Sequence, residues 1–382
     1  MTEKLKFILA IFTFWFCSIP SFGQTNQTQE AHKIDSIVNG YLISNKIVGL
    51  SIGIVKNGQL FYSKGYGFTN VDSQYAVSDS TKFLMASIGK LFTATAIMQL
   101  VEDGKLDLNK RLIDYLPEFK MTDERYTQIT LYQLMTHSSG LPWDVYMKNK
   151  SDVKNELRNY YTAFEKVKLK FDPGEKFSGA TYSNAGFNLL GAVIEKVSGM
   201  PYQIYIQKNI FEKLNINAAA IFYKPVTKQK IAQGIEFNNG VLQYCPVCPI
   251  GTYDQLPSGY FYSSASDMQK FMLHCLNVFN GAQTKGLLTK KTLDEMWGQQ
   301  KTIPNKKTSL GLCWWRYNDP TKNINFVFHV GDDPGNSSTL RIYPEQNIGI
   351  IILSNAYYSE HIVWNNLPDD IINLFKDEWK VK

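Results

Sequence analysis

The sequence predicts an α/β protein of the α+β kind, in which early and late strands share one antiparallel sheet flanked by helices. Strand-like stretches stand near the N-terminus ("VGLSIGIVKNGQLFYSKGYGF") and again in the C-terminal third ("GLCWWRY", "NFVFHVG", "SSTLRIYP" and "IGIIILSN"). The segments between them have helical spacing or are rich in turn residues. This order favours one composite domain over residues 24–382, with a mostly helical subdomain inserted at roughly 105–260.

The N-terminal stretch "MTEKLKFILAIFTFWFCSIPSFG" has the layout of a secretory signal peptide. Lys4 and Lys6 precede an apolar run over residues 7–19, and a small-residue exit follows at Gly23. Because this run is short for a membrane span, we expect cleavage after residue 23 and export to the periplasm or the medium. An uncleaved membrane anchor is the alternative. No later segment has eighteen consecutive apolar residues, so we expect no stable membrane insertion after cleavage.

The mature chain is expected to begin with a helix over residues 30–47, whose apolar residues share one face. A hairpin follows, because Asn57-Gly58 is a strong turn signal between two strands. The apolar run after residue 90 predicts a helix that Gly104 ends. Further helical segments are expected at "ITLYQLMTHSSGLP" with Thr130 as its cap, at 145–170, at about 186–197, in "SSASDMQKFMLHCLNVF" and at 361–377.

Composition indicates a globular protein with a substantial core, since 44% of the 382 residues are hydrophobic and 14% are aromatic. The net charge of +6 is mild and is not gathered into a basic stripe, which argues against a nucleic-acid partner. Removal of residues 1–23 leaves Cys245, Cys248, Cys275 and Cys313. In an oxidising compartment the close pair in "YCPVCPI" is spaced for a disulfide, while two free thiols or a zinc or redox role are the alternatives.

The stretch "MASIGKLF" holds a serine and a lysine three residues apart at the head of a predicted helix. Ser87 and Lys90 can share one helix face, which gives the hydroxyl an amine beside it. The apolar flanks favour a lysine that loses its proton and acts as a base. A helix-capping serine with a solvated lysine is the alternative, and the same spacing occurs in the polar "SDVK".

Two later triplets are also candidates for the site. Tyr182-Ser183-Asn184 lies in a loop before an apolar helix, where the phenol can relay a proton and the amide can bind a carbonyl. His329-Val330-Gly331 ends an apolar strand, where the glycine lets a ligand approach an exposed backbone edge and the histidine can donate to a substrate or polarise the site. Purely structural roles are the alternatives for both triplets. His137 is assigned a structural role in its loop, and Ser87 lacks the Gly-x-Ser-x-Gly context of a nucleophile elbow.

With Ser-x-x-Lys, Tyr-x-Asn and His-x-Gly in this order, the chain resembles the serine beta-lactamase and penicillin-binding-protein superfamily. It is most similar to the branch of class C beta-lactamases, D-alanyl-D-alanine carboxypeptidases and related esterases. The resemblance extends to "FDPGEKF", "YSNAGFNLLGAVIEKVSG", "PSGYFYSSASDMQKF" and "HVGDDPGNSSTLRIYPEQNIGIIILSN", and covers roughly residues 30–375. It implies a beta-lactamase/transpeptidase-like fold, no cofactor, and a small-molecule or peptide substrate such as an ester, a D-amino-acid peptide or a beta-lactam.

The resemblance also implies residue roles. Ser87 would attack an ester or amide carbonyl and form an acyl-enzyme. Lys90 and Tyr182 would share the proton transfer, with the identity of the general base left open. The backbone N–H groups of Ser87 and Asp332 would form the oxyanion hole. The substrate-binding residues would be Asn184, His329 and Gly331.

Two departures from the family pattern bear on the substrate. Beta-lactamases of this branch usually carry Lys-Thr-Gly where this chain has His329-Val330-Gly331, and Val330 has no hydroxyl to hold a substrate carboxylate. Tyr260 stands where relatives commonly have a second glycine. An esterase or D-amino-acid peptidase is therefore preferred to a true beta-lactamase, and a non-catalytic penicillin-binding sensor or scaffold is the further alternative.

Overall fold

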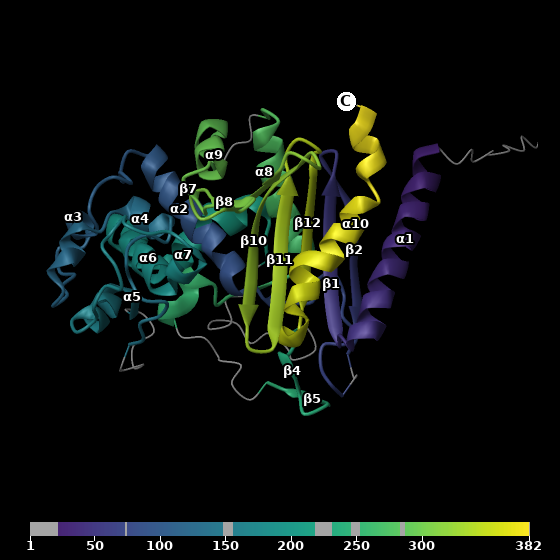
Figure 1. Cartoon of the computed structure of the whole chain (residues 1–382), viewed down its shortest axis with the longest axis horizontal. Helices are drawn as coiled ribbons and strands as arrows, with labels where there is room; N and C mark the ends of the chain where they lie inside the picture. Colours follow the sequence, from purple (N-terminus) through teal and green to yellow (C-terminus); the bar gives the residue numbers. More distant parts are fainter. Residues whose placement is uncertain are drawn as a thin grey trace, which may run out of the picture.

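The structure, a computed structural model, describes residues 22–72, 75–147, 156–217, 231–245, 253–282 and 287–381. Its central element is an eight-stranded antiparallel sheet, drawn as arrows in Figure 1. The strands, in sheet order, are β2 (Gln59–Gly67), β1 (Gly49–Lys56), β12 (Ile348–Ser354), β11 (Asn336–Tyr343), β10 (Ile324–Asp333), β9 (Trp315–Asp319), β8 (Thr308–Leu310) and β7 (Lys301–Thr302).

The pairing of β1 with β12 confirms that early and late strands share one antiparallel sheet. Both faces of this sheet are covered, which explains the unbroken apolar run of β12. Ile350 and Ile352 pack on one side with Ile34 of α1 (Phe22–Asn45), whereas Ile351 and Leu353 belong to the core on the other side. Alternate residues of one strand therefore join two separate cores.

Helices form the layers around the sheet (Figure 1). On one side lie α1 and α10 (Leu367–Asn373), and α8 (Ala265–Phe279) packs on the other side against β1 and β12. The remaining helices are α2 (Lys90–Glu102), α3 (Leu112–Tyr115), α4 (Leu131–Met135), α5 (Glu156–Tyr160), α6 (Asn184–Ser198), α7 (Tyr202–Ile206) and α9 (Lys290–Trp297). Figure 1 shows α3–α7 grouped to the left of the long strands, on the side where β10 lies.

Some predicted elements are shorter or interrupted. Helix in the described part of 145–170 is limited to α5 and the 3₁₀ turn Tyr161–Phe164. The closing helix is divided, because Pro368 lacks the N–H of a helix interior and lies in the first turn of α10, after a π-helical segment. "GLCWWRY" becomes a strand only at Trp315, since Cys313 has a φ of +70°.

A small hairpin of β4 (Ile235–Asn238) and β5 (Val241–Tyr244) was not anticipated. Its Asn239-Gly240 turn, with positive φ at both residues, is the same signal that correctly predicted the turn at Asn57-Gly58. Two minor strands, β3 (Phe83–Leu84) and β6 (Tyr262–Ser263), pair beside the turn that precedes α2.

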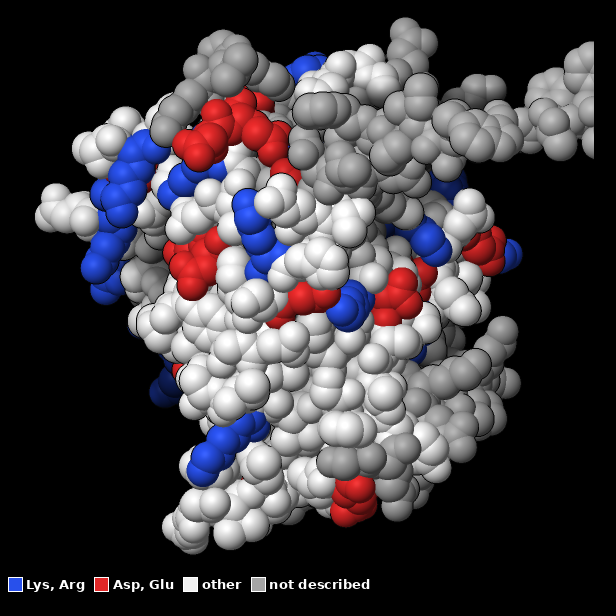
Figure 2. Space-filling view, turned by 90° about the vertical axis from the view of Figure 1, so that its right-hand side faces the viewer, with Lys and Arg blue, Asp and Glu red and all other residues white. Residues whose placement is uncertain are grey.

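Several predictions concern residues outside the described ranges. The signal peptide lies there apart from Phe22 and Gly23, which begin α1, and so does Cys248, the predicted partner of Cys245. Within the described ranges, no helix combines the length and apolar character needed to cross a membrane. Figure 2 shows acidic and basic side chains intermingled on the face that it presents, with no basic stripe.

Candidate active site

A cavity of about 570 Å³ lies where the end of β10, the turn before α2 and the start of α6 meet. Five of the seven predicted site residues line this cavity: Ser87, Tyr182, Asn184, His329 and Asp332. The other two, Lys90 and Gly331, are buried directly behind Ser87. The structure therefore brings together residues that are up to 245 positions apart, from Ser87 to Asp332.

Ser87 lies in the 3₁₀ turn Ala86–Gly89, which leads directly into α2. The residue in the N-cap position of α2 is Gly89, so Ser87 is not the cap of that helix. Ala86 has a φ of +47°, a left-handed conformation that is uncommon for a residue with a side chain. Backbone strain of this kind clusters at functional sites. The turn presents Ser87 to the cavity, where its side chain is half-buried.

Lys90 is fully buried and contacts the Ser87 hydroxyl. Its Nζ lies 2.9 Å from Ser87 Oγ and donates to the Ser258 carbonyl at 2.6 Å. Burial lowers the pKa of Lys90 to about 7, although the thiol of Cys313 and nearby carboxylates raise it. A neutral amine beside a serine hydroxyl can accept the hydroxyl proton, which is how a serine nucleophile is activated.

Tyr182 is held between Lys90 and His137. Lys90 Nζ lies 4.8 Å from the centre of the Tyr182 ring. The His137 ring stacks on the Tyr182 ring, with 4.1 Å between the two ring centres. His137 Nδ1 accepts a hydrogen bond from the Ser183 N–H (3.1 Å), which confirms the structural role predicted for His137. The Tyr182 hydroxyl has no well-formed hydrogen bond within the described residues. Burial raises the pKa of Tyr182 well above 10, and the adjacent Ser87 hydroxyl opposes this rise only in part.

Strand β10 reaches the Ser87 turn because Gly331 has no side chain. A Cβ at Gly331 would lie 2.5 Å from the Met85 carbonyl oxygen and 3.0 Å from the Ser87 amide nitrogen. Ser338 Oγ on β11 lies 3.2 Å from the carbonyl oxygens of both Met85 and Gly331, which ties the turn to the sheet. From the sequence, Gly331 was predicted to allow the approach of a ligand. In the structure, the Ser87 turn itself fills the space.

We therefore expect Gly331→Ala to separate β10 from the Ser87 turn. The added methyl group meets backbone atoms that cannot move independently, so the variant should lose about 1–3 kcal/mol of unfolding free energy. It should also lose turnover of any Ser87 substrate, because the two N–H groups of the oxyanion hole would move apart. Thermal unfolding and ester hydrolysis measure the two effects. Gly40→Ala in α1, where a Cβ meets nothing within 4 Å, is the control, and wild-type behaviour of both variants would contradict the argument.

His329 is buried at the cavity wall in its neutral form. Its Nδ1 lies 2.7 Å from the Val330 carbonyl oxygen, so this nitrogen carries the proton and donates it. Burial lowers the pKa of His329 to about 3. The Nε2 atom is then a hydrogen-bond acceptor, and it has no partner among the described residues. His329 thus offers a substrate an acceptor, which corrects the donor role predicted from the sequence, because the Nδ1 proton is already donated to the Val330 carbonyl.

Asn184 is the first residue of α6, which places its side chain at the cavity. Its N–H donates to the Trp143 carbonyl at 2.8 Å, and Ser183 caps the helix by accepting from the Gly186 N–H at 3.0 Å. The helix ends at Gly199, whose φ is +70°. The loop with Tyr182 is therefore fixed both by its own helix and by the segment with Trp143.

Cys313 is a second candidate nucleophile near Lys90. Among the described cysteines, it is the one whose thiol interacts electrostatically with the Lys90 amine. Its thiol is fully buried, and burial raises its pKa strongly, as it does for Cys275. A buried thiol that keeps its proton is a poor nucleophile. Ser87, which is open to the cavity, is the better candidate.

Sequence reasoning missed the contribution of the 3₁₀ turn Tyr253–Ser258 and the residue after it. Ser258 supplies the carbonyl oxygen that accepts from Lys90. Gly259 has a φ of +140°, and a Cβ there would lie 1.9 Å from the Ala86 carbonyl oxygen. The glycine of "PSG", just before Tyr260, was the sequence feature that could have indicated this close backbone contact. The aromatic and acidic residues of the cavity were also missed, and they are Trp143, Asp144, Tyr146, Trp315, Asp333, Tyr357 and Trp364.

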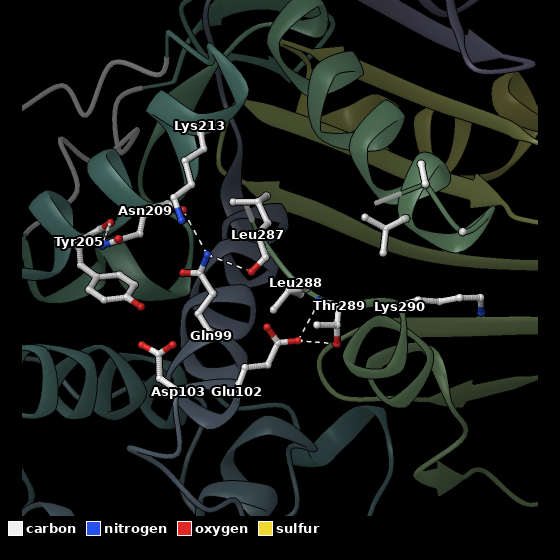
Figure 3. Close-up of a pocket in the computed structure, with 13 residues that line it drawn as sticks. Gln99, Glu102, Asp103, Tyr205, Asn209, Lys213, Leu287, Leu288, Thr289 and Lys290 are labelled. Carbon is white, nitrogen blue, oxygen red and sulfur yellow. Dashed lines mark hydrogen bonds between the residues drawn. The ribbon is translucent and has the colours of Figure 1, made fainter. Parts of the chain in front are cut away.

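A second cavity, of about 470 Å³, lies between α2 and the segment before α9 (Figure 3). Two of its polar side chains, Gln99 and Glu102, make contacts that hold these segments together. Gln99 Nε2 donates to the carbonyl oxygens of Asn209 and Leu287, and Glu102 accepts from both the N–H and the hydroxyl of Thr289. No described residue of this cavity repeats the serine–amine contact of the first, so the chemistry is assigned to the cavity at Ser87.

Comparison with known proteins gives a consistent family relationship. The family model described as Beta-lactamase matches residues 34–367. "Protein flp" of Staphylococcus aureus is 31% identical over 355 residues, which cover 91% of this chain and 68% of that protein. "Beta-lactamase-like protein 4" of Dictyostelium discoideum is 24% identical and covers 89% of this chain and 62% of its own length.

Solved structures share the fold. The penicillin binding protein from Bacillus halodurans superposes with a TM-score of 0.71 at 26% identity, covering 90% of this chain and 100% of that one. The octameric penicillin-binding protein homologue from Pyrococcus abyssi gives 0.70 at 24% identity, with 90% and 77% covered. SurE gives 0.76 at 22% identity, with 91% and 76% covered.

Proposed function

Since the chain belongs to the beta-lactamase family, whose members are mostly serine hydrolases, we propose that it is an exported serine hydrolase that cleaves ester or amide bonds through a Ser87 acyl-enzyme. Within that family we place it with the esterases and D-amino-acid peptidases. The observation that carries the proposal is the contact of 2.9 Å between Ser87 Oγ and a buried Lys90 whose pKa is lowered to about 7.

In the proposed reaction, Ser87 Oγ attacks the substrate carbonyl carbon and forms a new C–O bond, while its proton passes to Lys90 directly or through Tyr182. The carbonyl oxygen becomes negatively charged and accepts hydrogen bonds from the backbone N–H groups of Ser87 and Asp332. The proton then passes to the leaving alcohol or amine as its bond to the carbonyl carbon breaks. Water attacks the acyl-enzyme in the same way and releases the acid.

Val330 supports the preference for esters and D-amino-acid peptides over beta-lactams. It stands beside the cavity with an aliphatic side chain, and it cannot donate a hydrogen bond to a substrate carboxylate. A true beta-lactamase would need such a donor from another residue. A penicillin-binding sensor would acylate at Ser87 and release the acyl group slowly, because its deacylation step would be impaired.

A panel of reagents tests the proposal and separates these alternatives. We expect a fluorophosphonate probe to label Ser87, and short-chain nitrophenyl esters to be turned over much faster than nitrocefin. Fast nitrocefin turnover would indicate a beta-lactamase, and stable labelling by a fluorescent penicillin without turnover would indicate a sensor. If none of these reagents modified Ser87, the proposed hydrolase would be wrong.

A further inference from the structure

The cavity at Ser87 is lined by acidic side chains. Asp144, Asp332 and Asp333 all line it, and no described residue of its wall is a lysine or arginine. Their charges are coupled, since each of the other two carboxylates contributes to raising the pKa of Asp333. Burial is the larger cause and raises this pKa to about 6, so Asp333 is still ionised at neutral pH.

Lys90 offsets this charge only in part. Its amine is buried behind Ser87, and a pKa of about 7 leaves it largely uncharged above neutral pH. Three carboxylates that line one cavity, with no basic side chain in its described wall, favour a positively charged ligand and disfavour an anionic one. A substrate with a free carboxylate beside the reacting carbonyl would therefore be repelled, in contrast to one with an ammonium group.

The hydrogen-bonding groups of the cavity wall also favour a ligand that donates hydrogen bonds. His329 is 99% buried, and its unpartnered Nε2 is an acceptor because Nδ1 donates to the Val330 carbonyl. This acceptor is independent of the carboxylates, and a buried polar atom without a partner is costly unless a ligand supplies a donor. An ammonium group is such a donor, with up to three N–H groups.

Aromatic side chains complete the cation-binding character of the cavity. Trp143, Tyr146 and Tyr357 line it and remain 49%, 61% and 40% exposed. Ring faces of this kind attract ammonium groups and cover the apolar carbons beside them. The Tyr146 hydroxyl donates to Asp144 at 3.1 Å, so an aromatic ring and a carboxylate are held together at the cavity wall.

From this combination we infer that the enzyme takes substrates with an ammonium group close to the scissile carbonyl, held by Asp333, Asp144 and the aromatic wall. The inference rests on the proposed Ser87 hydrolase and names its substrate class. The ammonium group belongs either to the acyl part, as in a peptide or ester of an amino acid with a free amine, or to the leaving group, as in an aminoalkyl ester. Both present the same chemistry to the cavity.

The test compares two fluorophosphonates that differ only in a terminal trimethylammonium or tert-butyl group, using their second-order rates of Ser87 labelling. We expect the cationic probe to react about tenfold faster, as for a charge-assisted contact, and the ratio to fall toward one in Asp333→Asn and in 0.5 M salt. Asp294→Asn, an exposed residue of α9 paired with Lys290, is the matched control and should leave the ratio unchanged.

Matched substrates then show on which side of the scissile bond the ammonium group is recognised. Alanine p-nitroanilide against its N-acetyl derivative, in both enantiomers, tests the acyl side, and butyrylcholine against 3,3-dimethylbutyl butyrate tests the leaving-group side. Equal labelling of Ser87 by the two fluorophosphonates would overturn the charge preference and leave the hydrolase standing. Failure of both probes to label Ser87 would instead remove the proposed function itself.

Discussion

Ser87→Ala is expected to abolish acyl-enzyme formation and to reduce ester turnover by roughly 10⁴–10⁶-fold, the scale of loss when the nucleophile of a serine hydrolase is removed. The reason is that no other described side chain at the cavity combines a hydroxyl open to substrate with a buried amine at 2.9 Å. Intact-protein mass spectrometry after fluorophosphonate treatment should show one adduct on the wild type and none on the variant. Steady-state hydrolysis of p-nitrophenyl butyrate gives the rate loss.

The unfolding temperature of Ser87→Ala shows whether the loss of activity reflects loss of the fold. In the variant the buried Lys90 amine loses its contact with Ser87 but keeps its hydrogen bond to the Ser258 carbonyl, so the variant should unfold at a temperature close to that of the wild type. Ser80→Ala, an exposed serine on the segment before β3, is the control and should keep both the adduct and the turnover. An adduct that persists in Ser87→Ala, or turnover within tenfold of the wild type, would contradict the assignment of the nucleophile.

The sequence predicted those parts of the fold that local patterns determine. The hairpin at Asn57-Gly58 follows from turn chemistry, and α6 follows from an apolar face that ends at Gly199. The shared sheet of early and late strands was predicted from the order of elements along the chain. Boundaries at Cys313 and Pro368 were missed, because a positive φ and a divided helix arise from packing that a single segment does not encode.

The candidate site was predictable only through family resemblance, since each motif alone also has a structural explanation. Local reasoning could not find Ser258, because its contribution is a backbone carbonyl that any residue could supply. The apolar flanks of Lys90 did favour its burial, but they could not show that the distant turn with Ser258 helps to cover it. The segment around Gly331 alone could not show its second role, in which the absence of a Cβ lets the Ser87 turn approach β10.

Burial shifts the pKa values of Lys90 and Tyr182 in opposite directions, which distinguishes their roles in proton transfer. Burial moves the pKa of Lys90 down to about 7 and the pKa of Tyr182 well above 10, so a neutral amine is accessible at neutral pH and a phenolate is not. We therefore expect Lys90 to be the general base and Tyr182 to relay the proton in its neutral form. Tyr182→Phe should lower the acylation rate but keep the pH at which the rate falls.

Lys90→Met should separate activity from stability. The variant keeps an unbranched buried side chain and loses the amine, so kcat/KM for esters should fall by about 10²–10⁴-fold. In the wild type, kcat/KM should decrease as the pH falls through about 7, because Lys90 becomes protonated, and this decrease should be absent from the residual activity of Lys90→Met. Stopped-flow acylation measured from pH 5 to 9 tests both statements.

The same pKa shift fixes the sign of the effect on stability. Between pH 7 and 10.5, Lys90 is protonated in the unfolded chain but largely neutral in the fold, so the unfolded state binds more protons and Lys90 makes the free energy of unfolding rise with pH. Lys90→Met removes that contribution, and it should unfold at no lower temperature than the wild type near pH 7, where burying the amine is costly. Denaturant unfolding at pH 7 and pH 9.5 measures the change. A variant that is strongly destabilised at both pH values, with its activity lost in proportion to its folded fraction, would show that Lys90 serves the fold and not the reaction.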